Sequence, residues 1–305
     1  MPPLSQPLSE PTRPTPRIVP HVLILATVLI MAAGLRFAHL DRPSLWYDEV
    51  IPMRLAREPT PAALIRLLFQ IEATRAPLHP LVLQAWLRAF GPNDLAGRTL
   101  AALCGLLTVI VVERIGRRLY DPKTGLWAAW LCAVSPLLVA YSQEVKMYSW
   151  LVLWTCLSWD LLFSLRESAR WPRALAFVLS QAALFYSHPL GGFMIVAQGV
   201  AYLAAWPTFA LRPIRWLVLQ GGLVVLAAPW IIHYLDHPPE YVLSRLPIKY
   251  LFGLPIGFIG GDFRTLAVCL GLIVVGLIAR VGGPRRIQLD RPASSGPLLI
   301  WFALP

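Results

Sequence analysis

The sequence has few charged side chains for its length. Only 14% of its 305 residues are Asp, Glu, Lys or Arg, whereas 57% are hydrophobic. A water-soluble globular domain of this length cannot bury so much apolar surface, so that class of protein is excluded. The apolar residues fall in runs of about twenty, the length of α-helix that crosses the hydrocarbon core of a bilayer.

Cysteine is also scarce, and its spacing excludes two kinds of site. The cysteines lie inside apolar runs without a CxxC pair or neighbouring histidines, at Cys104, Cys132, Cys156 and Cys269. A disulfide framework or a metal centre needs closer spacing or additional ligands. We therefore predict no metal site, and we interpret the cysteines as small apolar packing residues.

Acidic residues are outnumbered by basic ones, which gives a formal net charge of +11. Nucleic-acid binding would need the basic residues to gather on one water-facing surface. Here they lie between the apolar runs instead, a pattern typical of short cytoplasmic loops in membrane proteins. We therefore expect membrane lipid, and not nucleic acid, among the partners.

The alternation of apolar and basic segments predicts an all-α, polytopic transmembrane helical bundle of about eight complete spans plus a truncated one. Residues 1–20 are expected to be a disordered cytoplasmic tail, and 21–305 a membrane domain that is truncated at its C-terminus. Within it, 41–92 and 236–264 are expected to be external loops, the first with a short interfacial helix over 62–69. The expected spans are 22–40, 95–112, 126–141, 149–165, 174–186, 191–209, one ending near 234 and one ending near 280. The predicted location is the cell membrane, with the N-terminus in the cytoplasm.

The first cluster of chemically capable residues follows the first expected span, at Leu45-Trp46-Tyr47-Asp48-Glu49. A carboxylate held between aromatic rings and a membrane surface is well placed to act as a general base. The alternative interpretation is a freely solvated acidic pair.

Further polar clusters occur at three other places in the predicted external regions. Arg75 and His79 lie among prolines that could also simply begin a helix. Between two spans, Tyr141 to Tyr148 carries many polar groups at membrane depth, where polar residues are usually functional. On a helix, Ser142 and Lys146 would share one face. The side chains expected to line a cavity are His79, Gln143, Glu144, Tyr148 and His188, although the position of His188 alone favours an ordinary loop histidine. By contrast, Glu113 and Asp160 are expected to be snorkelling or paired residues near cytoplasmic ends.

In the order of these motifs the sequence resembles the C-type glycosyltransferase superfamily. The similar group contains protein O-mannosyltransferases, aminoarabinose transferases of lipid A and lipopolysaccharide galacturonosyltransferases. The matching motifs are Leu45 to Glu49, Pro77-Leu78-His79-Pro80-Leu81, Ser135-Pro136, and Tyr141-Ser142-Gln143-Glu144 to Tyr148. The sequence departs from the family pattern at Lys146, where arginine is usual, and at Pro77 to Pro80, which rearranges a His-Pro-Pro motif.

The resemblance implies a membrane glycosyltransferase that moves a sugar from a polyprenyl-phosphate donor to a hydroxyl-bearing acceptor on the extracytoplasmic face, with inversion. It assigns Asp48 as the catalytic carboxylate and Glu49 as a possible second carboxylate or acceptor contact. Lys146, Arg98 and Arg75 would bind the donor phosphate. No cofactor is predicted, and the sequence leaves open whether a divalent cation assists.

Two other classes of function remain as alternatives. A lipid or solute transporter, or a flippase, would need polar groups along a path through the membrane, and many transporters contain inverted repeats. We find no such repeat in the sequence. A non-catalytic membrane protein is the second alternative.

Overall fold

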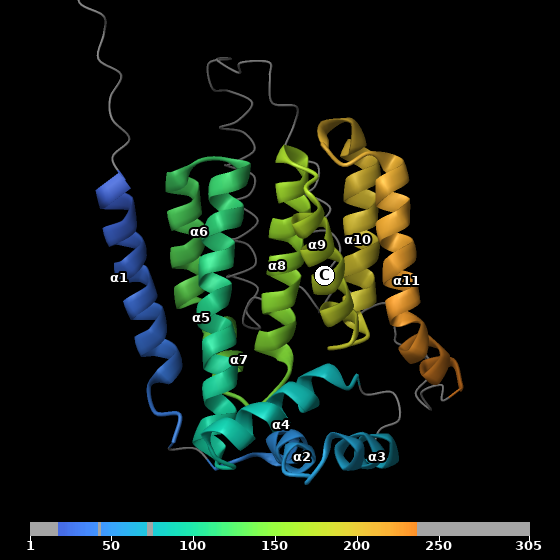
Figure 1. Ribbon diagram of the computed structural model, residues 1–305. Helices are drawn as coiled ribbons and strands as arrows, with labels where there is room; N and C mark the ends of the chain where they lie inside the picture. The colour runs from blue at the N-terminus through green and yellow to red at the C-terminus, as the bar shows by residue number, and fades with distance from the viewer. Residues whose placement is uncertain (1–17, 42–43, 72–75, 237–305) are drawn as a thin grey trace, which may run out of the picture.

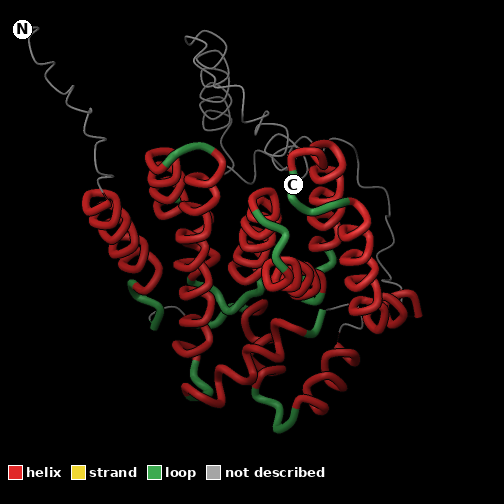
Figure 2. Tube along the Cα trace, turned by 45° about the horizontal axis from the view of Figure 1, so that its top comes forward, coloured by secondary structure: helices red, strands yellow, loops and turns green. Residues whose placement is uncertain are grey.

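The structure of the protein is a computed structural model that describes residues 18–41, 44–71 and 76–236. All regular elements in these ranges are helices (Figures 1 and 2). Several sequence predictions fall outside the described residues. They concern the tail before residue 18, Arg75, Cys269, the second external loop, the span ending near 280 and the truncated apolar run.

Five of the described helices are long and apolar enough to cross a membrane. They are α1 (Ile18–Phe37), α5 (Asp94–Leu119), α8 (Tyr148–Glu167), α10 (Leu190–Ala205, extended by the 3-10 turn Trp206–Thr208) and α11 (Pro213–Asp236). The expected span over 174–186 is α9 (Trp171–Phe185), whose 15 residues fall short of the roughly 20 that a bilayer requires. The predicted count of about eight spans is therefore not reached within the described residues.

The expected span over 126–141 is broken into two helices. These are α6 (Pro122–Val134) and α7 (Pro136–Ser142), which meet at a bend of 60° and raise the number of spans to six if the pair counts as one. Pro136 has no backbone N–H to continue the helix, and a proline disfavours helical geometry at the residue before it. Ser135 accordingly has extended backbone angles, with φ −60° and ψ 117°.

Three short helices lie across one end of the bundle (Figure 1). They are α2 (Tyr47–Ala56), α3 (Pro61–Ile71) and α4 (Leu78–Phe90), and α3 covers residues 62–69, where a short helix was predicted. A buried apolar cluster that includes Met53, Leu83, Leu87, Leu100 and Val145 joins α2, α4 and α5 to the segment before α8. The beginning of α5 therefore packs against α2 and α4 at this end of the bundle.

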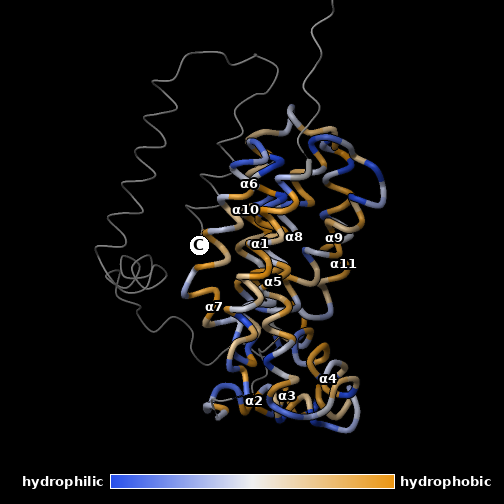
Figure 3. Tube along the Cα trace, turned by 90° about the vertical axis from the view of Figure 1, so that its left-hand side faces the viewer, coloured by the Kyte–Doolittle hydropathy of each residue, from blue (hydrophilic) through white to orange (hydrophobic). Residues whose placement is uncertain are grey.

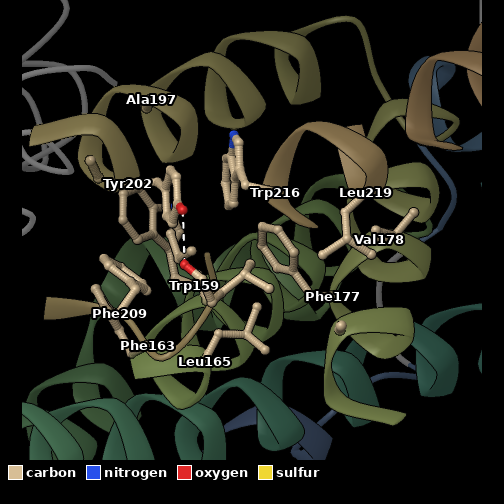
Figure 4. Close-up of a cluster of buried hydrophobic side chains, with 14 of the residues drawn as sticks. Trp159, Phe163, Leu165, Phe177, Val178, Ala197, Tyr202, Phe209, Trp216 and Leu219 are labelled. Atoms are coloured by element: carbon tan, nitrogen blue, oxygen red, sulfur yellow. Dashed lines mark hydrogen bonds between the residues drawn. The ribbon is translucent and has the colours of Figure 1, made fainter. Parts of the chain in front are cut away.

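The largest apolar core lies toward the other end, between α8, α9, α10 and α11. It contains Trp159, Phe177, Tyr202 and Trp216 (Figure 4), and the rings of Tyr202 and Trp216 stack with centroids 4.0 Å apart. Hydrophilic segments gather toward the two ends of the bundle, with more hydrophobic stretches along the helices between them (Figure 3).

The two acids predicted to be paired are both paired. Glu113 lies 3.0 Å from Arg117 on the same helix, and Asp160 contacts Arg114 at 2.9 Å and Arg118 at 3.1 Å. These arginines lie near the end of α5 that is remote from α2. Cys104, Cys132 and Cys156 are buried, which confirms their interpretation as packing residues.

Candidate functional site

The α2 end of the bundle contains a buried ion pair between Glu49 and Arg98. Both side chains are at most 3% exposed, and Arg98 donates to both carboxylate oxygens, at 2.9 and 3.1 Å. The backbone N–H of Val145 donates to Glu49 Oε1 at 2.8 Å, and that of Trp46 donates to Oε2 at 3.3 Å. Burial alone would raise the pKa of Glu49, but the hydrogen bonds from Arg98, Val145 and Trp46 outweigh it and lower that pKa. Glu49 is therefore an ionised carboxylate that ties α2 to α5 and to the segment before α8.

Arg98 also holds the chain between α1 and α2. It donates to the carbonyl oxygens of Leu40 at 2.9 Å and Ser44 at 3.2 Å. Its position is fixed by the start of α5, where Asn93 caps the helix by accepting a hydrogen bond from Ala96 N–H at 2.8 Å. Asp94, one turn before Arg98, pairs with Arg57 at 3.3 Å.

A second ion pair joins Asp48 and Lys146, which are far apart in the sequence. Lys146 Nζ lies 2.9 Å from Asp48 Oδ2. The lysine side chain is 6% exposed, whereas the aspartate side chain is 42% exposed. Lys146 Nζ also lies 5.4 Å from the ring centroid of Trp46 and 5.9 Å from that of Tyr148, within the range of a cation–π interaction. The pair thus presents a reachable carboxylate backed by a buried cation.

The segment that carries Lys146 is a non-helical connection over residues 143–147. The expectation that Ser142 and Lys146 share a helical face is therefore wrong, because α7 ends at Ser142. Gln143 Nε2 donates to the carbonyl oxygens of Leu35 at 2.9 Å and Ala38 at 3.2 Å, at the end of α1.

Glu144 is a third carboxylate of this site. Its Oε2 atom is buried without a hydrogen-bond partner among the described residues. Burial raises the pKa of Glu144, and repulsion by Glu49 and Asp48 adds to that effect, while Lys146 and Arg98 oppose it. Glu144 consequently favours its protonated form more than an ordinary glutamate does.

The two predicted histidines lie near Trp150, two residues after Tyr148. The His79 ring, on α4, is 6.4 Å from the Trp150 ring, and Trp150 Nε1 donates to Ser187 Oγ at 2.8 Å. His188 follows Ser187, and its Nδ1 accepts the backbone N–H of Leu190 at 3.1 Å. The backbone N–H of Leu78 donates to the Tyr186 carbonyl at 3.0 Å, which connects α4 to this turn.

The structure brings Asp48, Glu49, Arg98, Glu144 and Lys146 together at one end of the bundle. This arrangement can accept a proton at an exposed carboxylate and can stabilise an anion beside it. Within the described residues, no group of three or more His, Cys, Asp or Glu side chains is arranged to hold a metal ion. Sequence reasoning did not single out Arg36, although a charged residue inside an apolar run was a usable signal.

Comparison of the folds shows similarity to an archaeal oligosaccharyltransferase. One similar structure is the oligosaccharyltransferase AglB from Archaeoglobus fulgidus in complex with an inhibitory peptide and a dolichol-phosphate. It is 13% identical in sequence, with a TM-score of 0.53 over 93% of this chain and 36% of that chain. The apo form of the Archaeoglobus fulgidus oligosaccharyltransferase gives 14% identity and a TM-score of 0.50, over 90% of this chain and 40% of that chain. The chain thus spans at most about two fifths of the length of these structures.

The sequence comparisons add family membership to the fold. No match was found among curated proteins. The family model for dolichyl-phosphate-mannose-protein mannosyltransferases matches residues 74–233, which is just over half of the chain. Together with the helices long enough to cross a membrane, this match shows a multi-pass membrane protein with a glycosyltransferase fold. The chain therefore belongs to the dolichyl-phosphate-mannose-protein mannosyltransferase family, within the C-type glycosyltransferase superfamily.

Proposed function

We propose that this protein transfers a sugar from a polyprenyl-phosphate donor to a hydroxyl-bearing acceptor at the membrane face where α2, α3 and α4 lie. The observation that carries the proposal is the ion pair between the exposed Asp48 and the buried Lys146. A lipid-linked donor stays in the bilayer, so its reactive phosphate must be met at the interface, where these short helices and the ends of the spans come together.

In the proposed reaction Asp48 is the general base. The acceptor oxygen attacks the anomeric carbon of the sugar, and its proton passes to the Asp48 carboxylate. The bond between the anomeric carbon and the phosphate oxygen breaks, and its electron pair leaves with the lipid phosphate. The departing phosphate needs no acid catalyst, because the second pKa of a phosphate monoester is about 6. A single displacement inverts the anomeric centre.

Lys146 is proposed to stabilise the negative charge that develops on the phosphate. A cation already fixed in a poorly hydrated site stabilises such charge more than a solvated one does. Lys146 is buried and is bordered by the rings of Trp46 and Tyr148. Its contact with Asp48 would bring the base and the leaving group to one place.

The remaining predicted residues take supporting roles in the proposal. Glu49 and Arg98 are buried, paired with each other and hydrogen-bonded to backbone groups, so we assign them to holding α2 and the 143–147 segment in place rather than to direct contact with substrate. Arg75 is proposed as a further cation for the donor phosphate. His79, Gln143, Glu144, Tyr148 and His188 are proposed to line the cavity.

The AglB structure with bound dolichol-phosphate supports the choice of a lipid-phosphate donor, since this chain is similar to it in fold. The acceptor is proposed as a hydroxyl group of a lipid, polysaccharide or protein. We further propose that residues 21–305 form one membrane domain and that the protein is located in the cell membrane. Its active site would face away from the cytoplasm, since Arg114, Arg117 and Arg118 lie near the opposite end.

Replacing the proposed base tests the assignment. Asp48→Asn keeps the size of the side chain but removes the proton acceptor, so turnover should fall by about 10²- to 10⁴-fold while donor binding is retained. Transfer from a radiolabelled polyprenyl-phosphate sugar is the measurement. Asp94→Asn is the matched control, because Asp94 is 47% exposed and is also paired with a basic residue, Arg57. Near-parental turnover of Asp48→Asn would remove Asp48 from the mechanism and direct attention to Glu144 and His188.

A further inference from the structure

Arg36 is a fully buried arginine in the last turn of α1. It donates through Nη1 to the Ala133 carbonyl at 2.9 Å and through Nη2 to the Cys132 carbonyl at 3.1 Å. These two acceptors lie at the end of α6, 96 and 97 residues away in the sequence. Burying a guanidinium at membrane depth is costly, so its partners indicate what it is needed for.

The two carbonyls are those that the break after α6 leaves without their helical donors. In a continuous helix, Cys132 O would accept from the backbone nitrogen of residue 136, which is a proline and has no N–H. Ala133 O would accept from Leu137, but the extended backbone at Ser135 turns the chain away. Arg36 therefore supplies the donors that Pro136 removes. The negative end of the α6 dipole also favours a cation at this position.

A second contact joins the same elements, with the donor on the α7 side and the acceptors at the end of α1. Gln143, at the end of α7, donates to the Leu35 and Ala38 carbonyls that terminate α1. The Arg36 side chain thus caps the C-terminal end of α6, and the Gln143 side chain caps the C-terminal end of α1. We call this pair of contacts the α1–α7 clasp.

The α1–α7 clasp includes Gln143, which is the first residue of the 143–147 segment that carries Lys146. A small cavity of about 20 Å³ is lined by Arg36, Gly105, Tyr141, Ser142 and Ser149, among others, and Ser149 Oγ donates to the Tyr141 carbonyl at 2.8 Å across the turn. A side-chain carbon at Gly105 would collide with Ser142 and lie 3.0 Å from Arg36 Nε. The guanidinium of Arg36 and the Ser142 side chain therefore both pack closely against α5 at Gly105.

We propose that Arg36 is a positioning residue that fixes the 143–147 segment so that Lys146 meets Asp48. The chain of contacts runs from Arg36 to the bent junction of α6 and α7, then through α7 to Gln143 and on to Lys146. Its consequence for sugar transfer rests on the function proposed above. The placement of Lys146 by Arg36 stands independently of that function.

Chemical labelling of Lys146 tests the placement without any assay of activity. The amine is 6% exposed and paired with Asp48, so a water-soluble amine-reactive reagent should modify it slowly in the intact protein. Arg36→Gln removes the charge-assisted hydrogen bonds to α6 and should accelerate modification of Lys146 by at least about tenfold. The whole chain is labelled in detergent, and the modification of Lys146 is then measured by mass spectrometry of the peptide that contains it. Arg36→Lys keeps a cation but fewer donors and should give an intermediate rate.

Two further variants keep the test decisive. Gln181→Leu removes a buried hydrogen bond to Gln198 elsewhere in the bundle, and it should leave Lys146 labelling at the parental rate. Gln143→Leu breaks the other half of the α1–α7 clasp at a partly exposed position, so it provides the same test if Arg36→Gln does not fold. Slow, parental labelling of Lys146 in folded Arg36→Gln or Gln143→Leu would overturn the proposal.

Transfer measurements on the same variants connect the clasp to catalysis. If the proposed function holds, Arg36→Gln should lower kcat more than Arg36→Lys does. If the parent itself transfers no sugar while the labelling rates change as expected, the proposed function fails and the positioning role of Arg36 stands.

Discussion

At the scale of single residues, the site contrasts two neighbouring carboxylates that have different surroundings. Glu49 is buried and accepts hydrogen bonds at both oxygens from Arg98 and backbone N–H groups, whereas Asp48 is partly exposed and contacts Lys146 through one oxygen. A general base must be reachable by the acceptor hydroxyl, so exposure favours Asp48. Glu49 is a buried charge whose oxygens already accept hydrogen bonds from the protein, so it is suited to a structural role.

The charge of Lys146 should matter more than its exact shape. Lys146→Ala should reduce kcat/KM for the donor by about 10²-fold, because a buried cation beside the phosphate is lost. Lys146→Arg should retain most activity, since arginine also pairs with carboxylate and phosphate groups. Steady-state transfer kinetics measure both, with Lys123→Ala at the other end of the bundle as a control. Equal activity of Lys146→Ala and the parent would exclude Lys146 from the site.

Glu144 should make the stability of the protein depend on pH. Burial and the adjacent acids raise the pKa of Glu144 in the folded state, so the folded protein holds its proton to higher pH than the unfolded chain does. Its stabilising contribution is therefore complete below the unfolded pKa and is lost as pH rises through the folded pKa. As pH rises from the unfolded pKa to the folded pKa of Glu144, the melting temperature of the parent in detergent should fall. The melting temperature of Glu144→Gln should fall less. The same decline in both proteins would contradict this assignment.

At the scale of helices, α5 and α6 cross so closely that only glycine fits between them. A Cβ at Gly116 would lie 2.8 Å from the Gly125 Cα atom, and one at Gly125 would lie 2.7 Å from the Glu113 carbonyl oxygen. Small residues at such crossings let membrane helices approach backbone to backbone. The hairpin that leads to the α6–α7 bend is set by this contact.

Alanine at the crossing should therefore separate the two helices. Gly116→Ala should destabilise the protein by about 1–3 kcal/mol because the added methyl group overpacks the contact. Gly199→Ala is the matched control in α10, where a Cβ meets nothing within 4 Å. The control should be neutral or more stable by up to about 1 kcal/mol, since alanine favours a helix more than glycine does. Melting temperatures that do not separate the two variants would disprove the close crossing.

Local signals in the sequence predicted helices better than they predicted contacts between them. The amphipathic pattern over 62–69 coincides with a helix of the structure, α3. The break at Pro136 was not predicted, because a proline in an apolar run is compatible with a kinked span as well as with a new helix. Asp94 pairs with Arg57 and Arg98 pairs with Glu49, which are 37 and 49 positions away, and no local pattern in the sequence specifies either contact.

The site itself could be predicted only as a set of residues. Asp48 and Lys146 are brought together by the positions of α2, α5 and the 143–147 segment, which no local pattern specifies. Their pairing, and the different roles of Asp48 and Glu49, depend on burial and on which side chain faces Arg98. Those features follow from tertiary packing, and two adjacent acidic residues in a sequence do not reveal them.

At the scale of the whole molecule, the charged groups of the candidate site lie at one end of the bundle. This position favours a reaction at one membrane face over transport of a substrate through the bundle. The candidate site lies at the α2 end, and the paired acids Glu113 and Asp160 lie near the other end with their arginines. A transporter or flippase acts between two compartments and therefore needs a sealed bilayer. A glycosyltransferase needs only its donor and acceptor at the site.

Sugar transfer by the purified full chain in detergent tests this account most directly. The substrates are a radiolabelled polyprenyl-phosphate sugar and a water-soluble hydroxyl acceptor, and no membrane separates two compartments. We predict that labelled sugar becomes attached to the acceptor, that polyprenyl phosphate is released in equal amount, and that Asp48→Asn reduces both by about 10²-fold or more. Movement of the intact labelled donor across sealed liposomes, without transfer in detergent and unaffected by Asp48→Asn, would contradict the account.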